Sequence, residues 1–361
     1  MPTPAFDRIT DAPFGRLPDG RVVRLFSLRN RSGMSLGLLD YGGIIVSIHA
    51  ADREGRFDDV VLGFDGLQDY VERSPFFGAT IGRYANRIAR ARFMLDGQTY
   101  QLQPNDGPNL LHGGARGFDK RLWNGEPFTR GRDQGVRFTR VSPANEEGFP
   151  GTLQVTVEYL LSAVGALQCS FTADTDAPTV VNLAQHSYFN LSGTTMPVLD
   201  HELTIAARRY TPIDATMIPT GALAAVAETP FDFRTPRRIG DRIDDPDPQL
   251  RIGRGYDHNW VLDRDQRSAD DQQLSYAATV RHAGSGRRLD VFTTEPGLQF
   301  YSGNFLDGSL RGPQGPFVQR AGLCLETQKF PDTPNHPTFP TAVVRPGQRY
   351  FARTTFAFTH E

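Results

Sequence analysis

The sequence predicts an all-β protein, a large antiparallel β-sandwich, on three observations. Apolar residues alternate with polar ones over several short runs, a period of two that is typical of half-buried strands. Glycine occurs 36 times and proline 26 times among 361 residues, so turns separate these runs at frequent intervals. Helical periodicity is scarce, and residues 65–73 allow a helix of at most about two turns. Many short strands between turns favour a sandwich or a barrel, and this length favours a sandwich with long, ordered loops.

Individual strands can be placed in chain order. Residues 92–102 (RFMLDGQTYQL) predict a hairpin, because a two-residue Asp96-Gly97 loop favours the type I′ turn whose twist suits a hairpin. Apolar residues take alternate positions in residues 151–161 (GTLQVTVEYLL) and again in residues 165–171 (GALQCSF), which predicts two more strands with one buried face each.

Charge and composition argue against several classes of protein. The chain has 39 Lys and Arg against 41 Asp and Glu, and this net charge of −2 gives no electrostatic case for binding nucleic acid or an anionic membrane. No segment approaches the roughly 20 apolar residues of a membrane span. The start, MPTPAFDRIT, lacks the apolar core of a secretory signal. We therefore expect a cytoplasmic protein.

The chain shows no sign of internal division. It has no linker, charge run or repeat, so we expect one domain over residues 1–361 and a monomer, with a dimer left open. The acidic residues 241–249 (DRIDDPDPQ) predict an exposed loop. Cys169 and Cys324 lie in strand-like runs, where we expect them to be free thiols that behave as small hydrophobic residues.

Sequence motifs for metals, nucleotides and a serine nucleophile are absent or weak. The eight histidines form no H-x-H or H-x-x-x-H pair, and there is no P-loop or G-x-G-x-x-G, so we expect neither metal nor cofactor. GMSLG, residues 33–37, formally matches the G-x-S-x-G nucleophile elbow. That motif requires a helix to follow, whereas LLDYGGIIVSI is strand-like, which argues against it.

One carboxylate stands out within an apolar strand. In LCLETQKFPD, residues 323–332, Glu326 falls on the same strand face as Cys324. Burying a carboxylate costs several kcal/mol unless it is paired or hydrogen-bonded. A residue that costs so much stability is a candidate for function.

Five further segments place polar side chains beside aromatic ones near predicted strand ends. Each has a bland interpretation, such as a hydrogen-bonded core histidine, a solvated arginine, or a polar turn. Together they suit a sugar, since aromatic rings pack on its apolar face and Arg, Asn, Gln and Asp bind its hydroxyls. The segments are residues 81–93, 109–123, 180–193, 255–262 and 296–308.

At these positions the chain resembles the aldose 1-epimerase (galactose mutarotase) family. The resemblance runs nearly end to end, from YGG at Tyr41 to VVRPGQRY at 343–350. Its most specific motifs, in order, are GRYANRI, LHGGARGFDKRLW, HSYFNL, DHN, QFYSGNFLDG and ETQKFPDTPNHPTFP. The resemblance implies a large antiparallel β-sandwich, which agrees with the strand pattern, and an aldose as the small-molecule substrate.

The resemblance also implies roles for individual residues. Glu326 resembles the catalytic base of the family, and His186 resembles its acid. Six further residues resemble sugar contacts: Asn86, Arg87, His112, Tyr188, Asp257 and Gln299. The chain departs from the family pattern at Gln185, where Asn is usual, and at Glu295, where Gln is usual. These departures put the fine sugar preference in doubt and leave the reaction intact.

Interconversion of anomers requires the hemiacetal ring to open and close again. A base takes the proton of the C1 hydroxyl while an acid protonates the ring oxygen, and the roles reverse after rotation about C1–C2. We expect Glu326 and His186 to face each other across the sugar ring. We also expect a nearby carboxylate to raise the pKa of His186, against the effect of burial.

Two alternatives remain open on sequence alone. A glycoside hydrolase would use Glu326 and Asp257 as its pair of carboxylates and would not need His186 as an acid. A sugar-binding protein without turnover would lack an acid or a base, whereas both candidates are present here.

Overall fold

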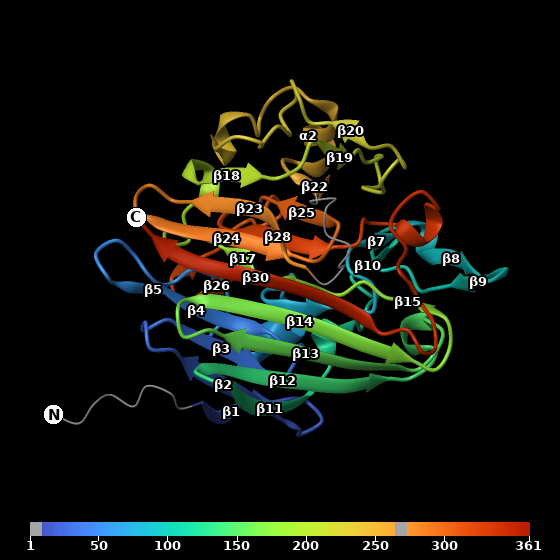
Figure 1. Cartoon of the computed structure of the whole chain (residues 1–361), viewed down its shortest axis with the longest axis horizontal. Helices are drawn as coiled ribbons and strands as arrows, with labels where there is room; N and C mark the ends of the chain where they lie inside the picture. Colours follow the sequence, from blue (N-terminus) through green and yellow to red (C-terminus); the bar gives the residue numbers. More distant parts are fainter. Residues whose placement is uncertain (1–8, 264–272) are drawn as a thin grey trace.

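The structure, a computed structural model, describes residues 9–263 and 273–361. Its largest unit is a sheet of nine strands, antiparallel at every pairing. Figure 1 looks onto its long strands. In spatial order they are β11 (Asn124–Arg130), β12 (Asp133–Ser142), β13 (Leu153–Leu161), β14 (Ala166–Thr175), β30 (Tyr350–His360), β24 (Arg287–Thr293), β23 (Ser275–Arg281), β18 (Glu202–Ile205) and β21 (Arg237–Arg238).

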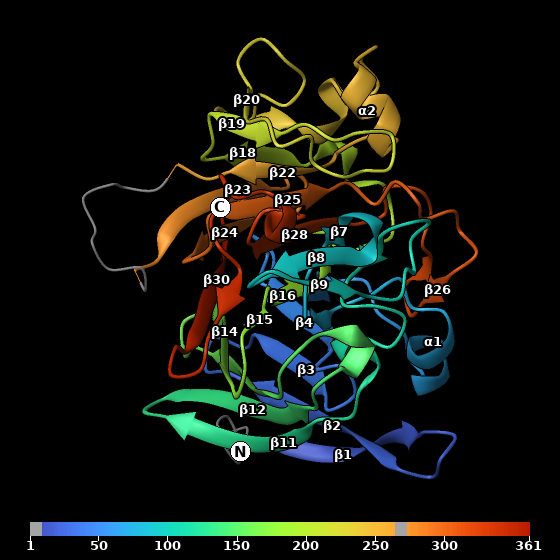
Figure 2. The ribbon, with the colours of Figure 1, turned by 90° about the vertical axis from the view of Figure 1, so that its right-hand side faces the viewer.

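Two smaller antiparallel sheets lie behind the nine-stranded sheet, as Figure 2 shows in side view. The five-stranded sheet follows chain order: β1 (Thr10–Arg16), β2 (Val22–Arg29), β3 (Ser35–Leu39), β4 (Ile45–Ala51) and β5 (Phe57–Asp59). The six-stranded sheet has the spatial order β17 (Tyr188–Phe189), β28 (Leu323–Gln328), β25 (Gly297–Tyr301), β22 (Asp257–Val261), β19 (Arg209–Thr211) and β20 (Ala224–Ala225).

Short two-stranded ribbons and single turns connect the sheets. The ribbons are β6 (Ala79–Ile81) with β16 (Ala184–His186), β7 (Arg87–Ile88) with β10 (Leu110–Leu111), β8 (Arg92–Leu95) with β9 (Gln98–Gln101), β15 (Thr179–Val180) with β29 (Val343–Val344), and β26 (Arg311–Gly312) with β27 (Gly315–Pro316). The α-helices of the described residues are α1 (Leu67–Glu72) and α2 (Pro248–Gly253). Neither helix is long and apolar enough to cross a membrane.

The apolar core lies between the nine-stranded sheet and the two smaller ones. Phe26 of β2 meets Phe138 of β12 edge to face, with ring centroids 5.8 Å apart. Phe189 of β17 meets Phe356 of β30 at 5.3 Å. One continuous cluster of buried residues joins all three sheets. This arrangement is a face-to-face sandwich, so the predicted fold class is confirmed.

Most of the predicted elements are confirmed. Strands β13 and β14 occupy the predicted runs, and β8 and β9 form the predicted hairpin. Asp96 and Gly97 both have positive φ, at 50° and 78°, as a type I′ turn requires. Both cysteines are buried and free.

The nucleophile-elbow interpretation fails, as the sequence pattern indicated. Ser35 opens β3, and the next element is strand β4 instead of a helix. Residues 241–249 differ in part from the predicted exposed loop. Ile243 in that stretch is only 3% exposed, and Pro248 already begins α2. The many acidic residues suggested an exposed loop throughout. They gave no sign that Ile243 is buried or that Asp247 caps the start of a helix.

Candidate active site

Strand β28 places Glu326 in the interior of the six-stranded sheet. It pairs with β25 on one side and β17 on the other, and all six of its residues are buried. Glu326 lies directly opposite Gln299 of β25, and one strand further Tyr301 lies opposite Asp257 of β22. The pairing of neighbouring strands therefore gathers polar side chains that are far apart in the sequence.

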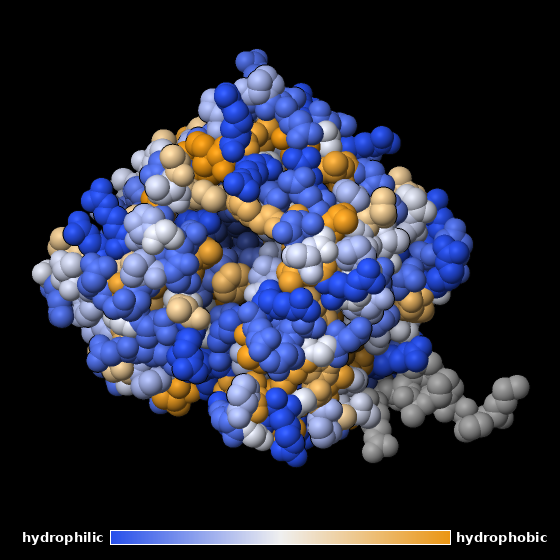
Figure 3. All heavy atoms as spheres, turned by 180° about the vertical axis from the view of Figure 1, so that it is seen from behind, coloured by the Kyte–Doolittle hydropathy of each residue, from blue (hydrophilic) through white to orange (hydrophobic). Residues whose placement is uncertain are grey.

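A cavity of about 160 Å³ opens beside Glu326. Figure 3 shows the face opposite the nine-stranded sheet, which is hollowed near its middle and has both polar and apolar residues around the hollow. The cavity is smaller than the roughly 300–1,000 Å³ of drug-sized sites, which suits a single small molecule. Seven of the eight predicted site residues line it, namely Asn86, Arg87, His112, His186, Tyr188, Asp257 and Glu326.

The two predicted catalytic residues are in direct contact. His186 Nε2 lies 3.6 Å from Glu326 Oε1, and both side chains are almost fully buried. This distance leaves no room for a sugar ring between them, so the expectation that they face each other across the ring is wrong. Both groups instead line the cavity as direct neighbours. Two groups this close together can act on two oxygens bonded to the same carbon, such as the C1 hydroxyl and the ring oxygen of a sugar.

The predicted pKa of His186 is also wrong in direction. Burial lowers the pKa of His186 to about 4. Burial also raises the pKa of Glu326 well above its usual value, and the charge of Asp257 adds to that rise while Arg87 opposes it. Loss of hydration outweighs the attraction of the carboxylate because both groups are taken out of water together. Burial therefore shifts both groups towards their uncharged forms.

His112 presents a defined hydrogen-bonding face. Its Nδ1 accepts the backbone N–H of Asn86 at 3.2 Å, so the neutral ring carries its proton on Nε2. Burial, together with the nearby His186 and Arg87, lowers the pKa of His112 well below its usual value. The neutral ring is therefore a hydrogen-bond donor at Nε2, suited to a sugar oxygen.

His112, His186 and Glu326 also have metal-ligand atoms within 4.8 Å of one another. A metal on Nε2 of His112 would require the lone pair that the Nε2 proton occupies. Moving that proton to Nδ1 would break the bond from Asn86. The hydrogen bonding thus favours a donor role for His112 over metal ligation.

Arg87 and Asp257 supply the charged walls of the cavity. Arg87 Nε donates to Asp106 Oδ2 at 2.7 Å, which holds the guanidinium in place. Gln299 does not line the cavity. Its Nε2 donates to Asp257 Oδ1 at 2.7 Å, so it supports Asp257 from behind. Gln299 was predicted as a direct sugar contact, and the structure gives it an indirect position.

The apolar walls of the cavity were not among the predicted site residues. Phe76 packs on His112 with ring centroids 4.6 Å apart, and Phe305 stacks on Tyr301 at 6.1 Å. Phe305 is 51% exposed, which is unusual for so large an apolar side chain. The remaining apolar walls are Pro75 and Leu111. The motif QFYSGNFLDG contained Tyr301 and Phe305, whereas nothing distinguished Phe76 in SPFFG from a core residue.

The two departures from the family pattern do not line the cavity. Gln185 donates to the carbonyl of Gly78 at 2.9 Å and accepts the N–H of Ser187. Glu295 is buried and pairs with Lys329 Nζ at 2.9 Å. Gln185 therefore acts on the backbone near the site, and Glu295 forms an ion pair outside the cavity.

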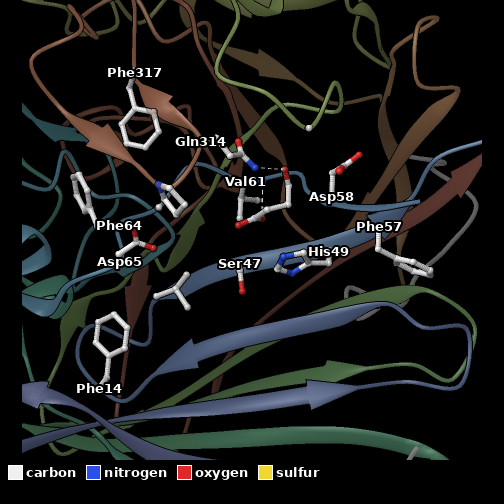
Figure 4. Close-up of a pocket in the computed structure, with 15 residues that line it drawn as sticks. Phe14, Ser47, His49, Phe57, Asp58, Val61, Phe64, Asp65, Gln314 and Phe317 are labelled. Atoms are coloured by element: carbon white, nitrogen blue, oxygen red, sulfur yellow. Dashed lines mark hydrogen bonds between the residues drawn. The ribbon is translucent and has the colours of Figure 1, made fainter. Parts of the chain in front are cut away.

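A second, larger hollow of about 530 Å³ lies beside β4 and β5. Figure 4 shows Phe14, Phe64 and Phe317 on one side of it and His49 with Asp58 on the other. None of the predicted site residues lines this hollow. It holds no buried carboxylate–imidazole pair.

A buried carboxylate–imidazole pair in a small cavity with polar and aromatic walls, on an antiparallel sandwich, defines an acid–base enzyme for a sugar-sized molecule. The family model for aldose 1-epimerase matches residues 24–357. The chain belongs to the aldose 1-epimerase family.

Known relatives of this family are similar in sequence to nearly the whole chain. Galactose mutarotase of Mus musculus is 46% identical over 354 residues, which cover 97% of this chain and 98% of the relative. Aldose 1-epimerase of Escherichia coli K12 is 40% identical over 346 residues, covering 95% and 97%. Among solved structures, galactose 1-epimerase from Lactobacillus acidophilus NCFM superimposes with a TM-score of 0.85 at 27% identity, covering 98% of this chain and 99% of that one.

Proposed function

We propose that this chain interconverts the α and β anomers of an aldose, with Glu326 as base and His186 as acid. The observation that carries the proposal is the contact between Nε2 of His186 and Oε1 of Glu326 at 3.6 Å, inside a cavity of monosaccharide scale. Arg87, Asp257 and His112 bind the sugar hydroxyls and hold C1 against this pair.

The reaction needs one proton shared by the pair. Glu326 takes the proton of the C1 hydroxyl while protonated His186 gives its Nε2 proton to the ring oxygen, and the C1–O5 bond breaks. The open-chain aldehyde then faces a protonated Glu326 and a neutral His186. Both forms are favoured by burial. After rotation about C1–C2 the two protons return, and the ring closes on the other face of the carbonyl.

The preferred aldose can be determined by measuring the activity on several sugars. Galactose is favoured by the names of the relatives, while glucose, arabinose and xylose present similar hydroxyls. Polarimetry of freshly dissolved α-anomers over this panel, corrected for spontaneous mutarotation, measures the activity directly. Rates equal to the uncatalysed rates for every sugar would reject the proposal.

The same protein preparation tests the hydrolase alternative. A glycoside hydrolase would release nitrophenol from nitrophenyl glycosides with Glu326 and Asp257 as its carboxylates. We expect no release, because Asp257 is held by Gln299 as a binding group and His186 contacts Glu326 as the proton partner.

A further inference from the structure

His186 has a second partner that the proposed reaction leaves unused. Sγ of Cys324 lies 3.6 Å from Nδ1 of His186, and both side chains are buried. Cys324 is two residues before Glu326 on β28, so the two side chains project from the same face of one strand. One strand therefore contacts both ring nitrogens, with Glu326 at Nε2 and Cys324 at Nδ1.

The proposed chemistry makes a specific demand on Nδ1. Nε2 releases a proton to the ring oxygen and later takes it back, so Nδ1 must keep its own proton throughout. A buried N–H requires an acceptor. The backbone carbonyl of His186 favours a protonated ring too, but one of its two lone pairs already accepts the N–H of Gly78 at 3.0 Å. The lone pairs of Cys324 Sγ are the other acceptor within reach.

The sulfur can accept without adding charge. Burial raises the pKa of the Cys324 thiol well above its usual value, and the charges of Glu326 and Asp257 raise it further. The group therefore stays a neutral thiol. A carboxylate at this position would stabilise the imidazolium strongly, whereas a thiol holds the ring and leaves it free to return to the neutral form.

We propose that Cys324 is a positioning residue for the anomer interconversion proposed above. Its sulfur accepts the Nδ1–H of His186, fixes the tautomer, and keeps Nε2 directed at Glu326 and the sugar.

The first test reads the tautomer and does not depend on activity. Nitrogen-15 NMR of the histidine rings in the free protein at pH 7 should show His186 neutral, with the proton on Nδ1 and a bare Nε2. Cys324→Ala should move the ring towards a mixture of tautomers, while Cys169→Ala, which removes the other buried thiol from β14, should leave it unchanged. A wild-type ring with its proton on Nε2 would overturn the proposal, even in a fully active enzyme.

The second test separates positioning from sugar binding. Cys324→Ala should lower kcat about 2- to 10-fold, the value of one neutral hydrogen bond, with KM nearly unchanged. Cys324→Ser, which restores a neutral acceptor, should recover most of the loss, and Cys169→Ala should match wild type. An alanine variant with wild-type kcat and tautomer would overturn the proposal.

A pH profile adds a readout that a packing defect would not move. The titratable groups around the His186 ring are Glu326, His112, Tyr188 and Cys324. Cys324→Ala should shift the acidic limb of kcat/KM, because it changes the partner of the protonated ring, and Cys169→Ala should not. Absence of catalysis in the wild type would reject the proposed reaction, while the NMR result would still decide where the Nδ1 proton goes.

Discussion

At the scale of one residue, Glu326 lowers the stability of the fold while it supplies a reactive group to the site. Its Oε2 is buried and has no hydrogen-bond partner among the residues that the structure describes. Such an atom costs about 1–3 kcal/mol. A sugar hydroxyl is the group that would satisfy it.

Replacing Glu326 by Gln should abolish most turnover and preserve sugar binding. Gln is nearly isosteric and cannot accept the proton, so we expect kcat to fall by roughly 10²–10⁴, or about 3–5 kcal/mol of barrier. Polarimetry gives kcat, and calorimetric titration with the sugar gives binding. Glu295→Gln is the matched control, since Glu295 is equally buried but lies outside the cavity. If Glu326→Gln keeps wild-type rates, Glu326 is not the base.

The dependence of kcat/KM on pH should be a bell that belongs to the pair. At low pH His186 takes a second proton, and because burial lowers its pKa to about 4, the acidic limb should lie near pH 4. At high pH the pair loses its shared proton, which removes the acid. Measurement from about pH 3 to pH 9 covers the acidic limb and the beginning of the alkaline one. An acidic limb near pH 6.5, the usual value for histidine, would show that burial does not control His186.

Asp257→Asn should move the alkaline limb to lower pH. After burial, the negative charge of Asp257 is the second cause that raises the pKa of Glu326, so its removal lowers that pKa. KM should rise as well, because a sugar-binding group is lost. The pH at which the alkaline limb falls can be measured even when the maximum value of kcat/KM is lower. An alkaline limb that stays in place would mean that Asp257 does not act on Glu326 electrostatically.

Sequence patterns predicted most of the residues of the site. They did not predict how burial shifts the pKa values of those residues. The motifs supplied the seven side chains that meet in the cavity. They did not reveal the direction of the pKa shift of His186, because burial of a side chain depends on which distant strands cover it. Phe76 was missed for a related reason. An aromatic residue beside a glycine is as typical of a core as of a binding site.

At the scale of elements, the alternation of apolar and polar residues predicted the long strands. It did not predict which strands pair with one another to form the site. Strands β13 and β14 expose one face, so their period of two is visible in the sequence. Strand β28 is buried on both faces, and its neighbours β25 and β17 come from remote parts of the chain. Its register with Gln299 follows from tertiary packing, which no local pattern encodes.

The loop that carries His112 depends on a glycine at one position. Gly113 has φ of +85°, and a Cβ there would lie 2.0 Å from the carbonyl oxygen of Gly82. Gly113→Ala should therefore displace the loop, raise KM and destabilise the fold by more than the left-handed backbone alone would. The measurements are KM by polarimetry and the free energy of unfolding in urea.

Gly131→Ala is the matched control for that variant. Gly131 also has positive φ, +64°, but a Cβ there meets nothing within 4 Å. It should cost about 1–2 kcal/mol of stability, the usual penalty of the left-handed region, with KM unchanged. Equal effects of the two alanines on stability and KM would contradict a role for close packing at Gly113.

At the scale of the whole molecule, one apolar core connects all three sheets. Phe26 of β2, Leu325 of β28 and Phe356 of β30 belong to the same buried cluster. No smaller unit would keep that cluster intact, so we propose that residues 1–361 form a single domain. Thermal unfolding should then give one calorimetric transition whose van 't Hoff and calorimetric enthalpies agree. Two separable transitions would contradict a single domain.

The stability of the whole fold should carry the pH signature of Glu326. Its pKa in the folded protein is raised by burial and by Asp257, so above the unfolded value of 4.5 the folded state binds more protons than the unfolded state. The free energy of unfolding therefore falls as pH rises through this window, by up to about 1.4 kcal/mol per pH unit. Gln at position 326 binds no proton in either state and removes this loss.

Urea unfolding of wild type and Glu326→Gln at pH 5 and pH 8 tests this link between function and stability. The variant should gain stability relative to wild type at pH 8, and the gain should shrink at pH 5, where folded and unfolded Glu326 differ less in proton binding. Because His186 contacts Glu326, its opposite shift does not cancel in this difference, and the same comparison is made in the His186→Asn background. A gain that does not depend on pH would mean that Glu326 keeps an ordinary pKa in the fold, and the unpaired Oε2 alone would then account for its cost.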